Sequence, residues 1–343
     1  MTWDPVHLPD QTGRTLVVTG ATAGIGYFAA EQLAAAGAHV VLASRSAAKL
    51  ATAVAAIEHQ VPGARLDTVV VDLASLASVA RAAEQIAELP RVDGLLLNGG
   101  SMARKRGART ADGLPLMLGT HVVANAALLA GVLPALAATG ERDGADGHRT
   151  SPRVVHTSTG FVHRFPMAVA DVRRVPRLAI AAYTKAKTVT EVLAFELARR
   201  LEAAGVPVDS LVTRPGVGVD ARTPERAGIR DATTPYQRNP YTPWAQGKDT
   251  AAWSAVRAMA DPDARNGQYY APSGRATGAP VLVEPTARTA APEGDLAVRV
   301  VAQVEELAGT PLLVPVPSGP TSGGSATRPT GVTRRPTAEH GRS

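Results

Sequence analysis

The sequence predicts an α/β fold in which a parallel sheet is covered by helices on both faces. Short segments that are apolar throughout alternate with longer stretches of helical character, and strands buried on both faces have this continuous apolar pattern. A glycine-rich stretch follows the first of these segments directly, as in the first turn of doubly wound sheets. With right-handed crossovers, the expected architecture is a doubly wound, Rossmann-type parallel sheet.

The expected strands are short and rich in Val, Leu and Thr, as in TLVVT and LDTVVV. Such β-branched, apolar runs between turn residues are typical of strands. The strands are expected at residues 15–19, 40–43, 66–71, 93–97, 153–158 and 206–213, with a last one at 268–271.

Helices are expected between these strands. Gly37 and Gly205 mark the ends of two of them, and Ser75 is a suitable N-cap for another. The last long helix has an amphipathic pattern, which suggests one buried face and one exposed face. The helices are expected at residues 24–36, 47–60, 75–89, 115–138, 182–204 and, after an irregular stretch, 248–260.

A single domain is expected, because the sequence shows no internal repeat and no second core. Residues 1–318 would form it, with residues 219–247 as a proline-rich loop on the substrate side. Residues 319–343 are rich in Gly, Ser, Thr, Pro and Arg, which predicts a disordered tail. The N-terminus lacks the apolar segment of a secretory signal, and there is no cysteine, so a cytoplasmic location is expected.

Charge and composition argue against several other classes of function. The net charge is +6, and residues 319–343 supply half of it, which leaves a weakly basic body and predicts no nucleic-acid partner. The absence of cysteine excludes thiolate metal sites, and no metal is expected. The uncharged stretch 113–140 is long enough for a membrane span, but His121, Asn125 and Pro134 favour a buried helix in a soluble protein.

A glycine-rich turn, TGATAGIG at 19–26, joins the first expected strand to the first helix. Its GxxxGxG spacing permits a tight turn with bare backbone, and the helix N-terminus behind it favours a pyrophosphate. A turn without any ligand is the alternative. The residues expected to bind a dinucleotide here are Gly20, Thr22, Ala23, Gly24, Ile25 and Gly26.

The end of the second strand predicts which dinucleotide binds. An acidic residue at this point would accept hydrogen bonds from the ribose 2′-OH of NAD, but the sequence here is Leu42-Ala43-Ser44-Arg45. Arg45 can pair with a 2′-phosphate, and Ser44 can add a hydroxyl. NADP(H) is therefore the expected cofactor, with NAD(H) as the alternative. The competing interpretation is that Arg45 is only a surface residue at the start of the next helix.

Tyr183 and Lys187 are four residues apart in an expected helix, so both side chains lie on one face. A tyrosine with the ordinary pKa of about 10 is a poor acid–base catalyst at neutral pH, and a nearby ammonium lowers that pKa. Such a pair is common by chance. It gains meaning from the hydroxyls of Ser158 and Thr159 at the end of a preceding strand and from the glycine turn upstream.

Together these residues resemble the short-chain dehydrogenase/reductase family. The resemblance covers about residues 11–275, with the motifs in the family's order. The long gap between Thr159 and Tyr183 and the motif GQYYAP at 267–272 are similar to the retinol-dehydrogenase-like branch. Besides the glycine turn, the resemblance rests on Asp72-Leu73, Leu97-Asn98-Gly99-Gly100, Ser158-Thr159, YTKAK at 183–187 and Arg214-Pro215-Gly216.

The resemblance implies hydride transfer between NADP(H) and a small-molecule carbonyl or alcohol, which we expect to be apolar. Tyr183 would protonate the carbonyl oxygen, and Lys187 would also bind the nicotinamide ribose. Around the cofactor, Asp72 and Leu73 would flank the adenine, Asn98, Gly99 and Gly100 would line the ribose, and Pro215, Gly216 and Val217 would lie at the nicotinamide.

Two positions depart from the family pattern. The family ends its fifth strand with two serines, of which the second orients the substrate. Thr159 stands in that place and is expected to take the role, with Ser158 as the alternative. Counting back from Pro134, His121 stands where the family has an asparagine that holds a water for proton relay. His121 either relays protons itself or is a core histidine, and Asn125 lies one turn later.

Two further expectations concern function and assembly. A non-catalytic dinucleotide sensor of the same fold is the alternative to an enzyme, and the intact pair of Tyr183 and Lys187 argues against it. In the short-chain dehydrogenase/reductase family, which this sequence resembles, two long helices often pack against a partner subunit. Because the helix around 122–138 is apolar enough to need such cover, a homodimer or homotetramer is expected.

Overall fold

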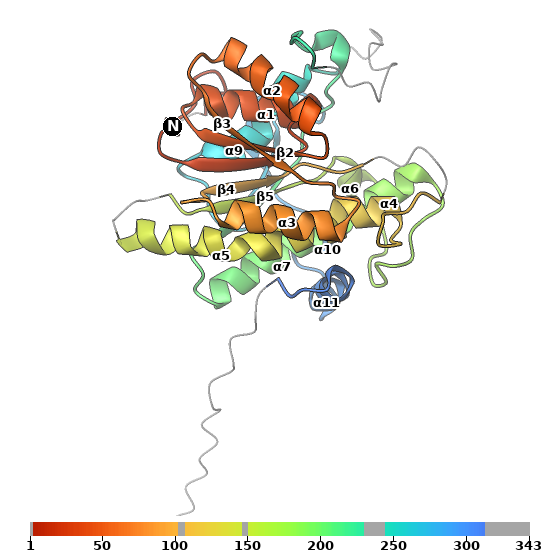
Figure 1. Cartoon of the computed structure of the whole chain (residues 1–343). Coiled ribbons are helices and arrows are strands. Elements are labelled where there is room, and N and C mark those ends of the chain that lie inside the picture. Colours follow the sequence, from red (N-terminus) through yellow and green to blue (C-terminus); the bar gives the residue numbers. More distant parts are fainter. Residues whose placement is uncertain (1–2, 102–106, 146–149, 230–243, 313–343) are drawn as a thin grey trace, which may run out of the picture. The chain divides into compact units, whose positions relative to one another are not determined.

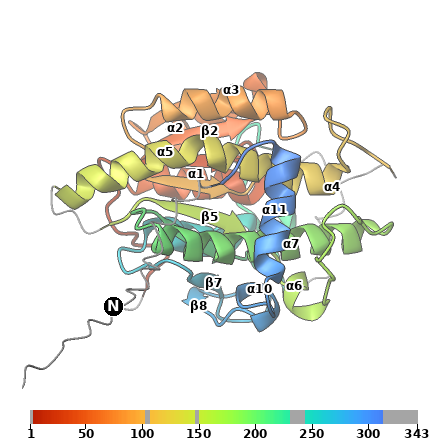
Figure 2. The same ribbon diagram turned by 90° about the horizontal axis from the view of Figure 1, so that it is seen from below.

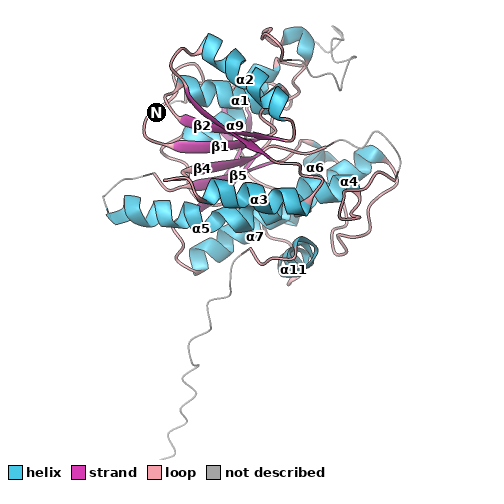
Figure 3. Ribbon diagram, in the orientation of Figure 1, coloured by secondary structure: helices cyan, strands magenta, loops and turns pink. Residues whose placement is uncertain are grey.

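The structure is a computed structural model that describes residues 3–101, 107–145, 150–229 and 244–312. Its centre is an eight-stranded sheet in the order β3-β2-β1-β4-β5-β6-β7-β8 (Figures 1 and 3). All neighbouring strands pair in parallel except β7 and β8. This confirms the predicted doubly wound, Rossmann-type sheet. The strands are β1 (Thr15–Thr19), β2 (His39–Ser44), β3 (Arg65–Val70), β4 (Gly94–Leu97), β5 (Arg153–Thr157), β6 (Asp209–Thr213), β7 (Tyr269–Pro272) and β8 (Pro280–Leu282).

Helices cover both faces of the sheet, and each face has its own apolar core. Successive strand residues point to opposite faces, so Leu16 and Val18 of β1 lie in one core and Val17 in the other. The first core also contains side chains of α1 (Gly24–Ala35), α2 (Ala47–Gln60) and α9 (Trp253–Ala260). The second contains side chains of α3 (Leu76–Ala87), α5 (Ala124–Ala145) and α7 (Ala179–Ala203).

The single helix expected at 115–138 is longer and less regular than its sequence pattern indicates. It starts with one turn, α4 (Leu116–Leu118), passes through a π-helical stretch at Gly119–Val123 and continues as α5 to Ala145. Such a stretch widens the helix locally and is frequent at functional sites. The side-chain amide of Asn125 donates to the carbonyl oxygens of Thr120 and His121 within it and to that of Gly99 after β4. Asn125 therefore ties the irregular turn to the end of a central strand.

Helix α7 was expected to be amphipathic, but it is buried on most of its sides. The sequence pattern did not identify α10 (Ala287–Ala290) and α11 (Leu296–Ala308), and both pack against α7. Figure 2 shows α11 crossing over α5 and α7, and Val300, Val301 and Val304 enter the same core as these two helices. On this side, α11 of the chain itself therefore covers the helices that were expected to pack against a partner subunit.

One described segment, Leu116–Gly144, is long and apolar enough to cross a membrane. It is the helix that packs on the sheet between α3 and α7, and 61% of its most apolar window is buried inside the fold. Most of this window therefore packs against the rest of the fold. The predicted tail at 319–343 and residues 230–243 of the predicted loop lie outside the described residues.

Candidate active site

The glycine turn leaves β1 at the carboxyl edge of the sheet, where the strand order reverses between β1 and β4. Gly20 has a φ of +70°, and a Cβ there would lie 3.0 Å from the Cα of Gly99. A Cβ at Gly26 would lie 2.5 Å from the carbonyl oxygen of Gly20 and from the side-chain nitrogen of Asn98. Backbone of the turn, of α1 and of the end of β4 therefore meets here without room for side chains.

Helix α1 starts at this turn without a capping side chain. Its N-cap, Ala23, has no side-chain oxygen, whereas Ser46 and Ser75 cap the N-termini of α2 and α3. Within the described part of the chain, the amides of residues 24–26 have no hydrogen-bond acceptor. Unpaired amides at the positive end of a helix dipole suit a phosphate group.

Polar side chains gather at the end of β2. The hydroxyl oxygens of Ser44 and Thr22 are 3.2 Å apart, which joins the strand end to the glycine turn. The next residue, Arg45, is exposed and has no ion pair with any residue that the structure describes. Its guanidinium is therefore available to an anion at this edge of the sheet.

Thr19 organises the turn after β4. Its hydroxyl oxygen accepts hydrogen bonds from the backbone N–H groups of Asn98 (3.0 Å) and Gly99 (2.8 Å), and the Asn98 side chain donates to the Thr19 carbonyl. Leu73 lies so close to Gly99 that an added Cβ would be 2.8 Å from its Cδ1 atom, and Asp72 precedes Leu73 after β3. The residues predicted for the adenine and ribose thus follow one edge of the sheet.

Tyr183 and Lys187 lie on one face of α7, as their spacing predicts. The Lys187 ammonium is 6.0 Å from the centre of the Tyr183 ring and donates a 2.6 Å hydrogen bond to the carbonyl oxygen of Thr157 in β5. Burial lowers the pKa of Lys187 to about 8, while the charge of Glu191 acts in the opposite direction.

Burial raises the pKa of Tyr183, against the lowering that the sequence argument expected from the ammonium. The reason is that an enclosed phenolate loses its hydration, and this cost outweighs the stabilisation by the hydrogen bond from Thr159. The phenol therefore keeps its proton at neutral pH, which is the state that a proton donor needs.

The two hydroxyls after β5 have different surroundings. Ser158 is buried, and its hydroxyl donates a 2.5 Å hydrogen bond to a carboxylate oxygen of Glu191. Thr159 is partly exposed, and a hydrogen bond from its side chain lowers the pKa of Tyr183. The geometry thus brings Thr159 to the phenol and keeps the hydroxyl of Ser158 away from it.

His121 contacts Tyr183 edge to face, with 5.3 Å between the ring centres. The imidazole lies directly against Gly100, where any Cβ would overlap it. Burial and the charge of Lys187 hold the pKa of His121 well below its usual range, so the ring is neutral at pH 7. Neither ring nitrogen has a hydrogen-bond partner among the described residues.

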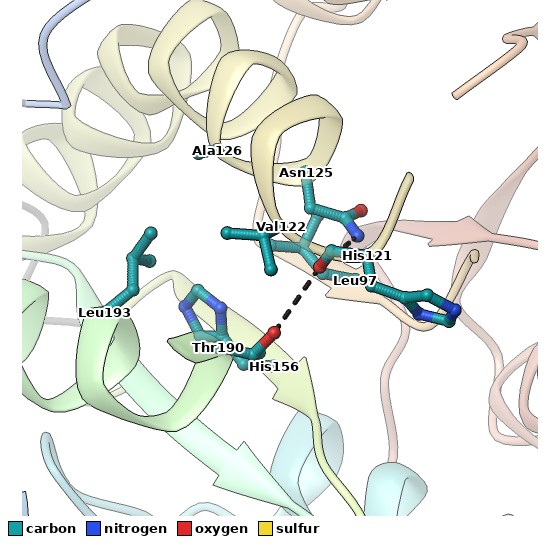
Figure 4. A pocket seen from close by; sticks show the side chains of 8 residues that line it. All are labelled: Leu97, His121, Val122, Asn125, Ala126, His156, Thr190 and Leu193. Carbon is teal, nitrogen blue, oxygen red and sulfur yellow. Dashed lines mark hydrogen bonds between the residues drawn. The ribbon is translucent and has the colours of Figure 1, made fainter. Parts of the chain in front are cut away.

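A small cavity lies behind these residues, between α5 and α7 (Figure 4). The ring of His156 and the side chains of Asn125 and Leu193 line it, whereas the ring of His121 points away from it. The carbonyl oxygen of His121 accepts a 3.4 Å hydrogen bond from the Thr190 hydroxyl at its edge. Burial and the charge of Lys187 lower the pKa of His156 to about 3, so the polar groups around the cavity are neutral.

The segment after β6 brings a residue to the site that the sequence motifs did not identify. Pro215, Gly216 and the exposed Val217 leave β6 as predicted, and a Cβ at Gly216 would lie 2.6 Å from the side-chain nitrogen of Gln246. That nitrogen is buried and has no partner in the described part of the chain. A β-bridge between Gly218 and Gln246 and a hydrogen bond from the Gly278 N–H to the side-chain oxygen of Gln246 place it there, and no local motif marks such contacts.

These observations fit a bound dinucleotide. The uncapped amides of α1 suit the pyrophosphate, the exposed Arg45 suits a phosphate on the adenosine ribose, and the unpaired amide of Gln246 suits a carboxamide or ribose group. At Gly20 and Gly26 of the turn, an added Cβ would lie within 3.0 Å of backbone atoms. Such a turn in a sheet of this strand order, followed by a Tyr–Lys pair, defines the class of dinucleotide-dependent oxidoreductases.

Comparison with known proteins identifies the family. The family model described as short chain dehydrogenase matches residues 14–139. The polyprenol dehydrogenase of Mus musculus is 34% identical over 263 residues, which cover 76% of this chain and 75% of that protein. The chain therefore belongs to the short-chain dehydrogenase/reductase family, and it is an oxidoreductase of that family.

Solved structures share the fold. The crystal structure of an uncharacterized protein from Mycobacterium paratuberculosis is 25% identical, with a TM-score of 0.68 over 92% of this chain and all of that one. A short chain dehydrogenase from Shigella flexneri, complexed with NADP, is 22% identical and has a TM-score of 0.56 over 77% of this chain and 99% of that one. At this identity the second likeness shows the fold alone.

Proposed function

We propose that this protein is an NADP(H)-dependent oxidoreductase that reduces a ketone or aldehyde, or oxidises the corresponding alcohol, with Tyr183 as the acid–base group. The observation that carries the proposal is the meeting of Thr159, Tyr183 and Lys187 beside the glycine turn. The end of β5 supplies Thr159 and α7 supplies Tyr183 and Lys187, at the edge of the sheet where the β1–α1 turn also lies.

In this proposal, side chains of the protein bind and protonate the carbonyl oxygen of the substrate. Bound NADPH supplies the hydride. Thr159 donates a hydrogen bond to the substrate oxygen and holds it near the phenol, and Tyr183 donates its proton to that oxygen. Lys187, fixed by the Thr157 carbonyl, stabilises the phenolate that remains. General acid catalysis of this kind contributes about 10²–10⁴-fold to a rate.

The preference for NADP(H) rests on the residues around the end of β2. Arg45 is exposed there and has no ion pair with a described residue, and Ser44 and Thr22 add two hydroxyls. A planar guanidinium pairs well with a phosphate dianion, whereas the ribose 2′-OH of NAD(H) finds no carboxylate. NAD(H) would bind more weakly at the same place.

His121 has a role in the proposal as a neutral imidazole in proton relay. It touches Tyr183, and both of its nitrogens are unpaired within the described part of the chain. A neutral ring can pass a proton by accepting at one nitrogen and donating at the other. His121→Asn should therefore retain more turnover than His121→Leu, and equal losses in the two variants would assign the ring to packing alone.

The substrate in this proposal is an apolar carbonyl compound or alcohol. Leu178 and Ile180, at the start of α7 and within five residues of Tyr183, are 68% and 48% exposed, and exposed apolar side chains next to a site favour apolar ligands. A relative is named for polyprenol, an apolar alcohol.

We place the enzyme in the cytoplasm. A homodimer or homotetramer remains part of the proposal, with an interface outside the face that α11 covers, and sedimentation of the full chain tests it.

The deciding experiment measures NADPH oxidation against a panel of ketones and aldehydes of increasing apolar size. Tyr183→Phe should abolish turnover and leave NADPH binding nearly intact, because only the hydroxyl is lost. Lys187→Ala should weaken NADPH binding more than Tyr183→Phe does, since it also loses the ribose contact. A Tyr183→Phe variant within a few-fold of the wild-type rate would refute the mechanism and favour a non-catalytic sensor.

A further inference from the structure

A buried carboxylate lies one helical turn beyond the Tyr–Lys pair, at Glu191 of α7. Its side chain is fully buried. Three hydroxyls donate to it: those of Ser158 at 2.5 Å, Tyr269 at 2.8 Å and Thr289 at 2.9 Å. These donors come from the end of β5, from β7 and from α10, so one carboxylate joins three separate parts of the chain to α7.

The first consequence concerns the pair of hydroxyls after β5. A short hydrogen bond to a carboxylate is roughly twice as strong as one between neutral groups, so the Ser158 hydroxyl is held on Glu191. Its backbone N–H is also engaged, with the carbonyl oxygen of Thr213. Thr159, the next residue, is then the hydroxyl left to face Tyr183. The contact with Glu191 thus leaves Thr159 as the hydroxyl that faces the phenol.

The second consequence is electrostatic. The charged and titratable groups that interact with Glu191 are Lys187 on its own helix, Arg214 after β6 and Tyr269 of β7. Lys187 in turn interacts with His121 and His156, both neutral at pH 7. Burial raises the pKa of Glu191 above its ordinary value, although its three hydroxyl donors and the charge of Arg214 act in the opposite direction. Ionised Glu191 favours the charged form of Lys187.

We propose that Glu191 is a positioning residue for the reaction: it holds the Ser158 hydroxyl away from the substrate, and its negative charge keeps Lys187 protonated beside Tyr183. The inference rests on the proposed function. The inference also extends the proposed function, because Thr289 joins α10 to Glu191 and so to the groups of the reaction.

The test compares the pH profiles of kcat/KM for NADPH-dependent carbonyl reduction in the wild type and in Glu191→Gln. Gln accepts hydrogen bonds but carries no charge. Losing the negative charge lowers the pKa of Lys187, so the alkaline limb, which requires the charged form of Lys187, moves to lower pH. We expect this limb to shift to lower pH by about one unit, since one nearby charge shifts a pKa by about 1–3 units. Glu191→Met is a second variant without the charge, should the first fail to fold.

Thr289→Ala is the matched control, because it removes another of the three donors and leaves the carboxylate in place. We expect this variant to stay within about threefold of the wild-type rate at the optimum, with no downward shift of the alkaline limb. A purely structural Glu191 would lower the melting temperature or the rate at every pH without moving the limb, and that result would overturn the inference. A loss in Ser158→Ala as large as that in Thr159→Ala would overturn it as well. If instead Tyr183→Phe keeps its turnover, the proposed function itself fails.

Discussion

Arg45 gives the sharpest test of how this site chooses its cofactor. The residue is exposed, is unpaired within the described part of the chain and follows the Ser44 hydroxyl at the end of β2. Since no ion pair has to break when a phosphate binds, the full gain of a charge-assisted pair is available. Such a bond contributes about 1.5–3 kcal/mol, and solvent screening at an exposed site reduces this toward the lower end.

Arg45→Ala should therefore weaken NADPH binding by roughly 10- to 30-fold, at about 1.4 kcal/mol for each factor of ten. Binding of NADH, which has no 2′-phosphate, should change by less than about twofold. Titration of nicotinamide fluorescence with each cofactor measures both constants. The preference should also shrink as salt is raised, because exposed charge pairs are screened.

Lys49→Ala is the control, since Lys49 is another exposed cation in the first turn of α2. It should leave the ratio of NADPH to NADH affinity within about twofold. If Arg45→Ala weakens both cofactors equally, or if the wild type binds both equally well, Arg45 does not recognise the 2′-phosphate and the reasoning fails.

Three other outcomes are expected. Tyr183→Phe should lower turnover by at least about 10²-fold, as measured by NADPH oxidation; a change of only a few-fold would contradict its role as the acid. Thr159→Ala should cost far more activity than Ser158→Ala, because the hydroxyl of Ser158 is held by a carboxylate; the reverse order would show that Ser158 serves the substrate. Val300→Ala, in the part of α11 that covers α5 and α7, should lower the free energy of unfolding by about 1–3 kcal/mol in denaturant titrations. Its control Val298→Ala, at a half-exposed position of the same helix, should change that free energy by less than about 0.5 kcal/mol.

Local patterns in the sequence carry much of the fold. Strands buried on both faces read as continuous apolar runs, and glycine is required where two backbones meet, as at Gly20 and Gly26. The spacing of Tyr183 and Lys187 places both on one helix face whatever surrounds the helix. Each of these features depends on residues a few positions apart, so the sequence displays them directly.

Tertiary contacts decided the rest of the candidate site. Ser158 and Thr159 are neighbours in sequence, yet one meets Glu191, 33 positions further on, while the other faces the phenol. The amide of Gln246 reaches Gly216 through a β-bridge with Gly218 and a hydrogen bond from Gly278. No motif marks such pairings, because the partners are separated by long and variable stretches of chain.

By itself, the sequence determined the parallel sheet, the dinucleotide turn and the Tyr–Lys pair. Only the tertiary structure showed that α10 and α11 bury α7, which the sequence pattern presents as an amphipathic helix. It also showed that burial raises the pKa of Tyr183 although an ammonium lies nearby. Both results depend on how completely a side chain is removed from water. That quantity is the sum of contacts from every element packed around it, and no local stretch of sequence contains it.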